Sequence, residues 1–180
     1  MIFLVPYAYD RMPGGKPREG VLANRLGSKA RCDALFRVVR KRNDLWSVIF
    51  ILTAGYSKES ARSTEKIPES IAEQMCIYVK EQGFSTHLSP KFSWGTFEET
   101  RNAISVISSF ALESVKEPCV YVSTNLGHMP RVWLCWFFLR RHKTWEVHFV
   151  LADHSFTPKE WLQETAKFFQ YLYRFVFKKW

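Results

Sequence analysis

The sequence is poor in cysteine and holds none of the common cysteine motifs. Its four cysteines, Cys32, Cys76, Cys119 and Cys135, are far apart, and no Cys-x-x-Cys pair is present. This spacing excludes a zinc ribbon and a thioredoxin-type redox motif. The histidines show no metal-site spacing either, so the sequence predicts no metal site. We expect the thiols to be buried and reduced.

Long hydrophobic runs are also missing. No segment reaches the ~18 consecutive apolar residues that a transmembrane helix needs. The first six residues contain a short apolar stretch without a preceding cationic region, which does not fit a signal peptide. These features predict a cytoplasmic protein without a transmembrane segment.

Acidic residues are in deficit, with 17 Asp and Glu against 26 Lys and Arg, for a net charge of +9. Such a surface favours anionic ligands, acidic membranes or nucleic acid, although solubility alone would also explain it. The basic cluster at 37–42 forms the end of an expected helix that runs to about Arg42, where positive charge complements the helix dipole. Nucleic-acid binding is therefore not the favoured interpretation.

Three common catalytic or phosphate-binding signatures are absent from the sequence. There is no Walker A sequence, no Gly-x-Gly-x-x-Gly and no Gly-x-Ser-x-Gly elbow. The sequence therefore leaves open whether the protein is an enzyme.

What the sequence does contain is a regular alternation of short apolar runs and helical patterns. Five apolar runs, at 2–5, 46–52, 84–88, from 119 and at 145–151, are each followed by a helical pattern. This alternation predicts one α/β domain over residues 1–180, a Rossmann-like three-layer sandwich. Its five-stranded sheet should be mostly parallel, in the order 3-2-1-4-5, with helices on both faces.

Polar residues follow most of these strands, and parallel topology gathers strand ends at one edge of the sheet. Arg131 is expected in a surface cleft, where it could hold an anion through a bidentate contact. His128 and Glu98 form the candidate acid–base pair, and Ser93 and Thr96 are candidate hydrogen-bond donors. The remaining candidate ligand-binding residues are Asn125, Ser57 and Asp10.

Simpler interpretations of these residues stay open. Residues 119–131 also fit an ordinary strand–loop–helix turn with one surface arginine. His128 could be merely polar or structural. Glu98 lies in the first turn of an expected helix, where the dipole favours a carboxylate in any case.

The last helix is rich in aromatic residues. It begins at a capping box, Thr157-Pro158-Lys159-Glu160. One face, which includes Trp161, Phe168 and Phe175, is expected to pack on the sheet. The off-face residues Tyr171, Phe177 and Trp180 predict a contact with a second subunit, as a homodimer, or with an acidic surface.

The segment at 123–132, Ser-Thr-Asn-Leu-Gly-His-Met-Pro-Arg-Val, resembles the hallmark Thr-Ser-x-x-His-Met-x-Arg-Ala of the YdcF-like (SanA/ElyC-type) bacterial domains. A second family motif, Ser-x-Asn-Thr-x-Glu-Asn, is similar to residues 93–99, with matches at Ser93, Thr96 and Glu98. The resemblance implies a Rossmann-like fold with a ligand site of poorly defined activity. A family member is reported to bind S-adenosylmethionine, and others are linked to envelope polysaccharide processes.

Together these features favour a cytoplasmic domain that binds a small anionic ligand, nucleotide-like or S-adenosylmethionine-like, at the C-terminal edge of its sheet. Two alternatives remain. One is a transferase or phosphoester hydrolase in envelope polysaccharide metabolism that uses His128 and Glu98. The other is a basic interaction module that uses the last helix.

Overall fold

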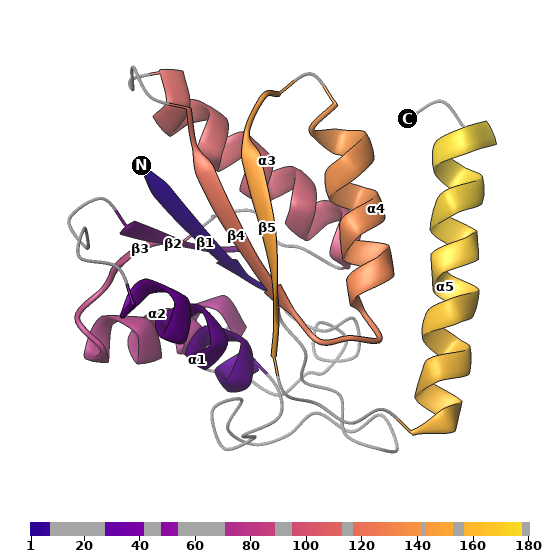
Figure 1. Ribbon diagram of the computed structural model, residues 1–180, viewed down its shortest axis with the longest axis horizontal. Coiled ribbons are helices and arrows are strands. Elements are labelled where there is room, and N and C mark those ends of the chain that lie inside the picture. Colours follow the sequence, from indigo (N-terminus) through magenta and orange to yellow (C-terminus); the bar gives the residue numbers. More distant parts are fainter. Residues whose placement is uncertain are drawn as a thin grey trace, which may run out of the picture.

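The computed structural model describes residues 1–7, 28–41, 48–53, 71–88, 95–112, 117–141, 143–152 and 157–177. In these residues five strands alternate with five helices along the chain (Figure 1). In chain order they are β1 (Ile2–Pro6), α1 (Ser28–Val39), β2 (Val48–Leu52), α2 (Ile71–Glu81), β3 (Ser85–Leu88), α3 (Thr96–Leu112), β4 (Cys119–Thr124), α4 (Met129–Leu139), β5 (Glu146–Leu151) and α5 (Pro158–Phe177).

The strands form one sheet in the order β3-β2-β1-β4-β5, and every neighbouring pair is parallel. This is the predicted α/β architecture and the predicted strand order. β1 and β4 are neighbours although they are far apart in the chain, and Ile2 pairs with Cys119 while Pro6 pairs with Ser123. Their junction is the topological switch point, outside which ligands bind in open α/β sheets.

Helices cover both faces of the sheet. α1 and α2 pack on one face, with Leu4 and Phe50 at the centre of the contact, and α3 and α4 pack on the other, around Phe3 and Val122. Figure 1 shows the two helix pairs on opposite sides of the strands. The protein is therefore a Rossmann-like three-layer sandwich. In the described part of the chain, no helix combines the length and hydropathy needed to cross a bilayer.

The central strands explain why the sequence shows continuous apolar runs instead of alternation. A parallel strand covered on both faces must be apolar at every position. In β1 all five residues are buried, whereas the edge strands β3 and β5 are partly exposed along their length.

α5 begins at the predicted capping box. The backbone N–H of Thr157 donates to Oε2 of Glu160 at 2.7 Å, and the Glu160 N–H donates to Oγ1 of Thr157 at 3.3 Å. Pro158 occupies the first helical position, as expected.

The packing of α5 differs from the prediction. The helix packs against α4, beyond the sheet (Figure 1), and the ring of Phe175 stacks on Phe138 of α4 at 4.8 Å. It does not complete the core, because α3 and α4 already cover that face of the sheet. Its single buried side chain is Glu164.

Tyr7, directly after β1, ties the layers together at the carboxyl ends of the strands. Its N–H donates to the Ser123 carbonyl at 3.1 Å, and its carbonyl accepts from Arg31 of α1 at 2.6 Å. Its hydroxyl contacts Oγ1 of Thr100 and accepts from Nε1 of Trp136 at 3.0 Å. Burial raises the pKa of Tyr7 well above its usual range, so the hydroxyl stays protonated.

We predict that Tyr7→Phe lowers the free energy of unfolding by about 1–3 kcal/mol, because it leaves the buried indole N–H of Trp136 without its acceptor. Urea denaturation measures the change. Ser109→Ala removes an exposed hydroxyl of α3 and is the control. Equal stability of the two variants would show that the hydroxyl of Tyr7 does not hold α4 in place.

Candidate functional site

The turn between β4 and α4 places His128 at the start of the helix. Asn125 organises this turn: its carbonyl accepts from the N–H groups of His128 and Met129 at 3.1 and 3.0 Å. Its side-chain Oδ1 also accepts from the His128 N–H at 3.3 Å. His128 is the N-cap, and Pro130 lies in the first turn, as the sequence predicted. These hydrogen bonds to Asn125 hold His128 at the start of α4.

His128 and Arg131 contact each other across the first turn of α4. Nη2 of Arg131 lies 2.7 Å from Nδ1 of His128. A guanidinium can only donate hydrogen bonds, so Nδ1 is the acceptor and the ring proton is on Nε2. Nε2 in turn lies 3.6 Å from Oε1 of Glu164 on α5. The imidazole is therefore held between the arginine and a carboxylate.

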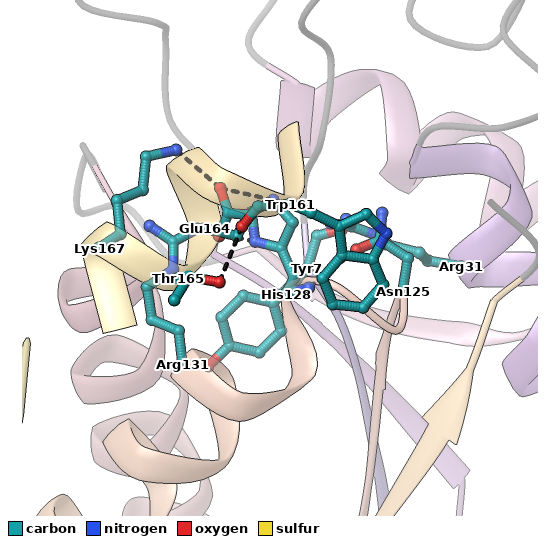
Figure 2. Close-up of polar contacts among 9 residues, drawn as sticks. All are labelled: Tyr7, Arg31, Asn125, His128, Arg131, Trp161, Glu164, Thr165 and Lys167. Carbon is teal, nitrogen blue, oxygen red and sulfur yellow. Dashed lines mark hydrogen bonds and ion pairs between the residues drawn. The ribbon is translucent and has the colours of Figure 1, made fainter. Parts of the chain in front are cut away.

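Glu164 is the anionic centre of this cluster. Its Oε2 lies 3.1 Å from Nη2 of Arg131, and its Oε1 lies 2.7 Å from Nζ of Lys167. Figure 2 shows Glu164 of α5 beside His128 and Arg131, with the ammonium group of Lys167 directed at the Glu164 carboxylate. Arg131 is buried, with only 8% of its surface exposed, and not in the expected surface cleft. The guanidinium of Arg131 and the carboxylate of Glu164 therefore form a buried ion pair.

Tyr171, also on α5, covers the guanidinium of Arg131. The guanidinium carbon lies 5.6 Å from the centroid of the ring, in the range of a cation–π contact. Burial raises the pKa of Tyr171, and the charge of Arg131 partly offsets this effect. α5 thus binds Arg131 through one carboxylate and one aromatic face.

Several buried polar atoms at the end of β4 have no hydrogen-bond partner among the described residues. Buried polar groups are nearly always hydrogen-bonded, so such a group of atoms needs an explanation. Four of these atoms can donate a hydrogen bond. Three are on or directly after β4, and the fourth is in the first turn of α4: Oγ of Ser123, Oγ1 of Thr124, Nδ2 of Asn125 and Nε of Arg131.

The structure brings three of the predicted site residues, Asn125, His128 and Arg131, into one cluster. Thr96 is buried at the start of α3, where its carbonyl accepts from Oγ1 of Thr100 at 2.7 Å. Three other predicted residues lie outside the described part of the chain. They are Asp10, Ser57 and Ser93.

Glu98 lies near the cluster but is not the carboxylate that the structure places against His128. Its charge and that of Arg131 both act on the pKa of Tyr171, which places the first turns of α3 and α4 close together. The acid–base partner predicted for His128 was Glu98, whereas the carboxylate nearest to the imidazole in the described residues is Glu164.

Sequence reasoning missed Glu164, Lys167 and Arg31. One signal for Glu164 was present: it falls between Trp161 and Phe168 on the apolar face of the last helix, where a charge requires a partner. Arg31 gave no such signal, because it lies among other basic residues of the first helical pattern.

Comparison of the chain with protein-family models, curated proteins and solved structures finds no match. The YdcF-like assignment therefore remains an expectation that rests on the sequence motifs.

We predict that Arg131 and Glu164 are strongly coupled. Arg131→Met or Glu164→Gln alone should destabilise the protein by about 3–5 kcal/mol, because each change leaves a buried charge without its partner. The double variant should lose less than the sum of the two single changes. Urea denaturation of all four proteins completes this double-mutant cycle.

The control is Lys159→Met, which removes an exposed positive charge from the start of the same helix. Its stability should change by less than about 0.5 kcal/mol. Additive losses in the cycle would contradict the coupling and would make Glu164 an ordinary helix residue.

Proposed function

We propose that the protein binds a small anionic ligand at the carboxyl ends of β1 and β4. The observation that carries this proposal is the group of four buried donors without partners, on Ser123, Thr124, Asn125 and Arg131. A ligand that reaches several of them needs more than one acceptor oxygen. Phosphate and carboxylate groups provide them.

The position of these donors supports the proposal. They lie at the carboxyl end of β4 and in the turn and helix after it, at the topological switch point, where ligands of open α/β sheets bind. They also precede or lie in the first turn of α4, whose N-terminus favours negative charge.

The ion pair with Glu164 limits how Arg131 can bind the proposed anion. Nη2 of Arg131 is already directed at Glu164 and at His128. Its Nε remains available, so Arg131 would contribute one donor and not a bidentate contact. The main anion contacts in this proposal come from Ser123, Thr124 and Asn125.

The donors fit more than one ligand class. Phosphate oxygens of a nucleotide and the carboxylate of S-adenosylmethionine are both acceptors, so the donors alone do not select between them. The predicted contributions of Asp10, Ser57 and Ser93 belong to the same proposal. The cytoplasmic location expected from the sequence is part of the same proposal.

The transferase or phosphoester hydrolase remains the alternative. It requires His128 to exchange protons with a ligand. Nδ1 of His128 accepts from Arg131, and Nε2 faces Glu164, so both ring nitrogens are directed at protein groups. This arrangement favours a structural role for His128 and supports binding over acid–base catalysis.

For α5 we propose a contact between two copies of the chain, one of the two partners expected from the sequence, instead of a basic interaction module, and we base it on other residues than the expected Tyr171, Phe177 and Trp180. The outward face of α5 carries exposed apolar residues with heptad spacing, a pattern typical of helix pairing. Two copies of one apolar stripe can pair about a twofold axis, and each then covers the other. The stripe consists of Leu162, Phe169, Tyr173 and Val176.

We predict that the double variant Ser123→Ala, Thr124→Val loses anion binding but keeps the fold, because neither hydroxyl has a protein partner among the described residues. Thermal shift identifies the ligand from a set of phosphate, pyrophosphate, nucleotides, sugar nucleotides and S-adenosylmethionine. A ligand at about 100 times its Kd stabilises by about 2.7 kcal/mol. Calorimetry should then show at least tenfold weaker binding to the variant, the loss expected for one hydrogen bond to a charged group (~1.5–3 kcal/mol).

The matched control is Ser109→Ala, Thr144→Val, which removes two exposed hydroxyls far from this edge. It should bind as the wild type does. Absence of any stabilising anion, or equal affinity of the Ser123 and Thr124 variant, would refute the proposed site.

A separate prediction concerns the mass of the protein in solution. The wild type should scatter light as a dimer, and Phe169→Gln, Val176→Gln should scatter as a folded monomer. Gln163→Ala, Gln170→Ala changes exposed polar positions of the same helix and should remain dimeric. A monomeric wild type would leave the apolar stripe without its proposed partner.

A further inference from the structure

Three potential metal ligands meet near the amino ends of β4 and β5, at the opposite end of the strands from the proposed anion site. They are Sγ of Cys119, a carboxylate oxygen of Glu146 and a ring nitrogen of His148, and these atoms all lie within 4.8 Å of one another. Nε2 of His148 lies 2.8 Å from Oε1 of Glu146. The group belongs neither to the proposed anion site nor to the core.

Strand pairing places these side chains together. Cys119 is the register partner of Glu146, and His148 is the register partner of Tyr121. Side chains two residues apart on a strand share a face of the sheet, so all four point to the same side. The imidazole stacks on the Tyr121 ring, with centroids 4.7 Å apart and planes inclined by 18°, which orients its nitrogens.

The chemistry of the three ligands determines which metal ion they prefer. Thiolate, imidazole and carboxylate together favour Zn²⁺ over Mg²⁺ or Ca²⁺, which prefer oxygen ligands alone. Bond lengths of about 2.0–2.3 Å around a tetrahedral zinc ion put its ligand atoms about 3.4–3.6 Å apart. Zinc binding therefore requires the wider of the observed separations to shorten and the 2.8 Å between Nε2 and Oε1 to lengthen, through rotations of the exposed Glu146 and partly exposed His148 side chains.

We infer that Cys119, Glu146 and His148 bind a zinc ion and leave its fourth position open to water or a further ligand. On binding, the Cys119 thiol loses its proton to solvent and its sulfur coordinates the metal as thiolate. The ion would join the edge strand β5 to β4 at their amino ends. It would therefore stabilise the exposed edge of the sheet.

Zinc and cobalt binding to the whole chain test this inference. Calorimetry should give a Kd for Zn²⁺ of about 1 µM or tighter. Co²⁺, which adopts the same site, should show a thiolate-to-cobalt charge-transfer band. Cys119→Ser should abolish the band, and His148→Ala should weaken zinc binding at least tenfold, the lower bound for loss of even an indirect metal contact.

The control is His87→Ala, which removes a histidine from the other edge strand, β3, and should leave zinc binding unchanged. A second measurement needs no variant. Iodoacetamide should label the half-exposed Cys119 first, because Cys32, Cys76 and Cys135 are buried and burial raises the pKa of Cys135 to about 12. Zinc should protect Cys119 from this labelling.

Three results would overturn the inference: no binding near 1 µM, a charge-transfer band that survives Cys119→Ser, or labelling of Cys119 at the same rate with and without zinc. Each result can be obtained without knowledge of the ligand that binds at the carboxyl ends of the strands. Failure of the zinc site therefore leaves the proposed anion site unaffected.

Discussion

The ion pair between Arg131 and Glu164 is the interaction on which the arrangement around the candidate site depends. A buried guanidinium without an anion would cost several kcal/mol, so α4 requires a carboxylate at this point. The carboxylate comes from α5, a helix that buries no other side chain. Together with the stacking of Phe175 on Phe138, this ion pair holds α5 against α4 and directs Nη2 of Arg131 at Glu164. The contact of the same Nη2 with His128 sets the ring proton on Nε2. One buried ion pair thus affects both the helix packing and the chemistry available at the edge of the sheet.

Tyr7, directly after β1, joins the elements on the other side of the switch point. Its backbone joins the ends of β1 and β4 and receives Arg31 from α1, while its hydroxyl holds groups on α3 and α4. All of these contacts are buried, where hydrogen bonds are strong and an unmet partner is costly. The unpartnered donors at the end of β4 and in the turn after it therefore lie next to a set of contacts that joins both faces of the sheet.

The fold was predictable because it depends on local patterns. Buried parallel strands appear as short apolar runs, and the alternation with helices leaves few topologies, of which the predicted strand order is one. The capping box at Thr157 was equally local. The packing of α5 was not predictable, because periodicity identifies an apolar face but not its partner. The sequence pointed to Asn125, His128 and Arg131, yet it could not identify Glu164, whose role arises only when α5 meets α4.

Cys119 and His148, at the other end of β4, also form a group that could not be predicted from the sequence. Their spacing in the chain matches no metal motif, and only strand register brings them together. β4 therefore carries both proposed sites, one at each end, and its pairing with β5 serves both. At the carboxyl end, the Ala152 N–H donates to the Thr124 carbonyl at 2.9 Å. A register shift of one residue between β4 and β5 would turn His148 to the opposite face from Cys119 and break this bond. The two sites differ in chemistry, but both require the same alignment of the same two strands.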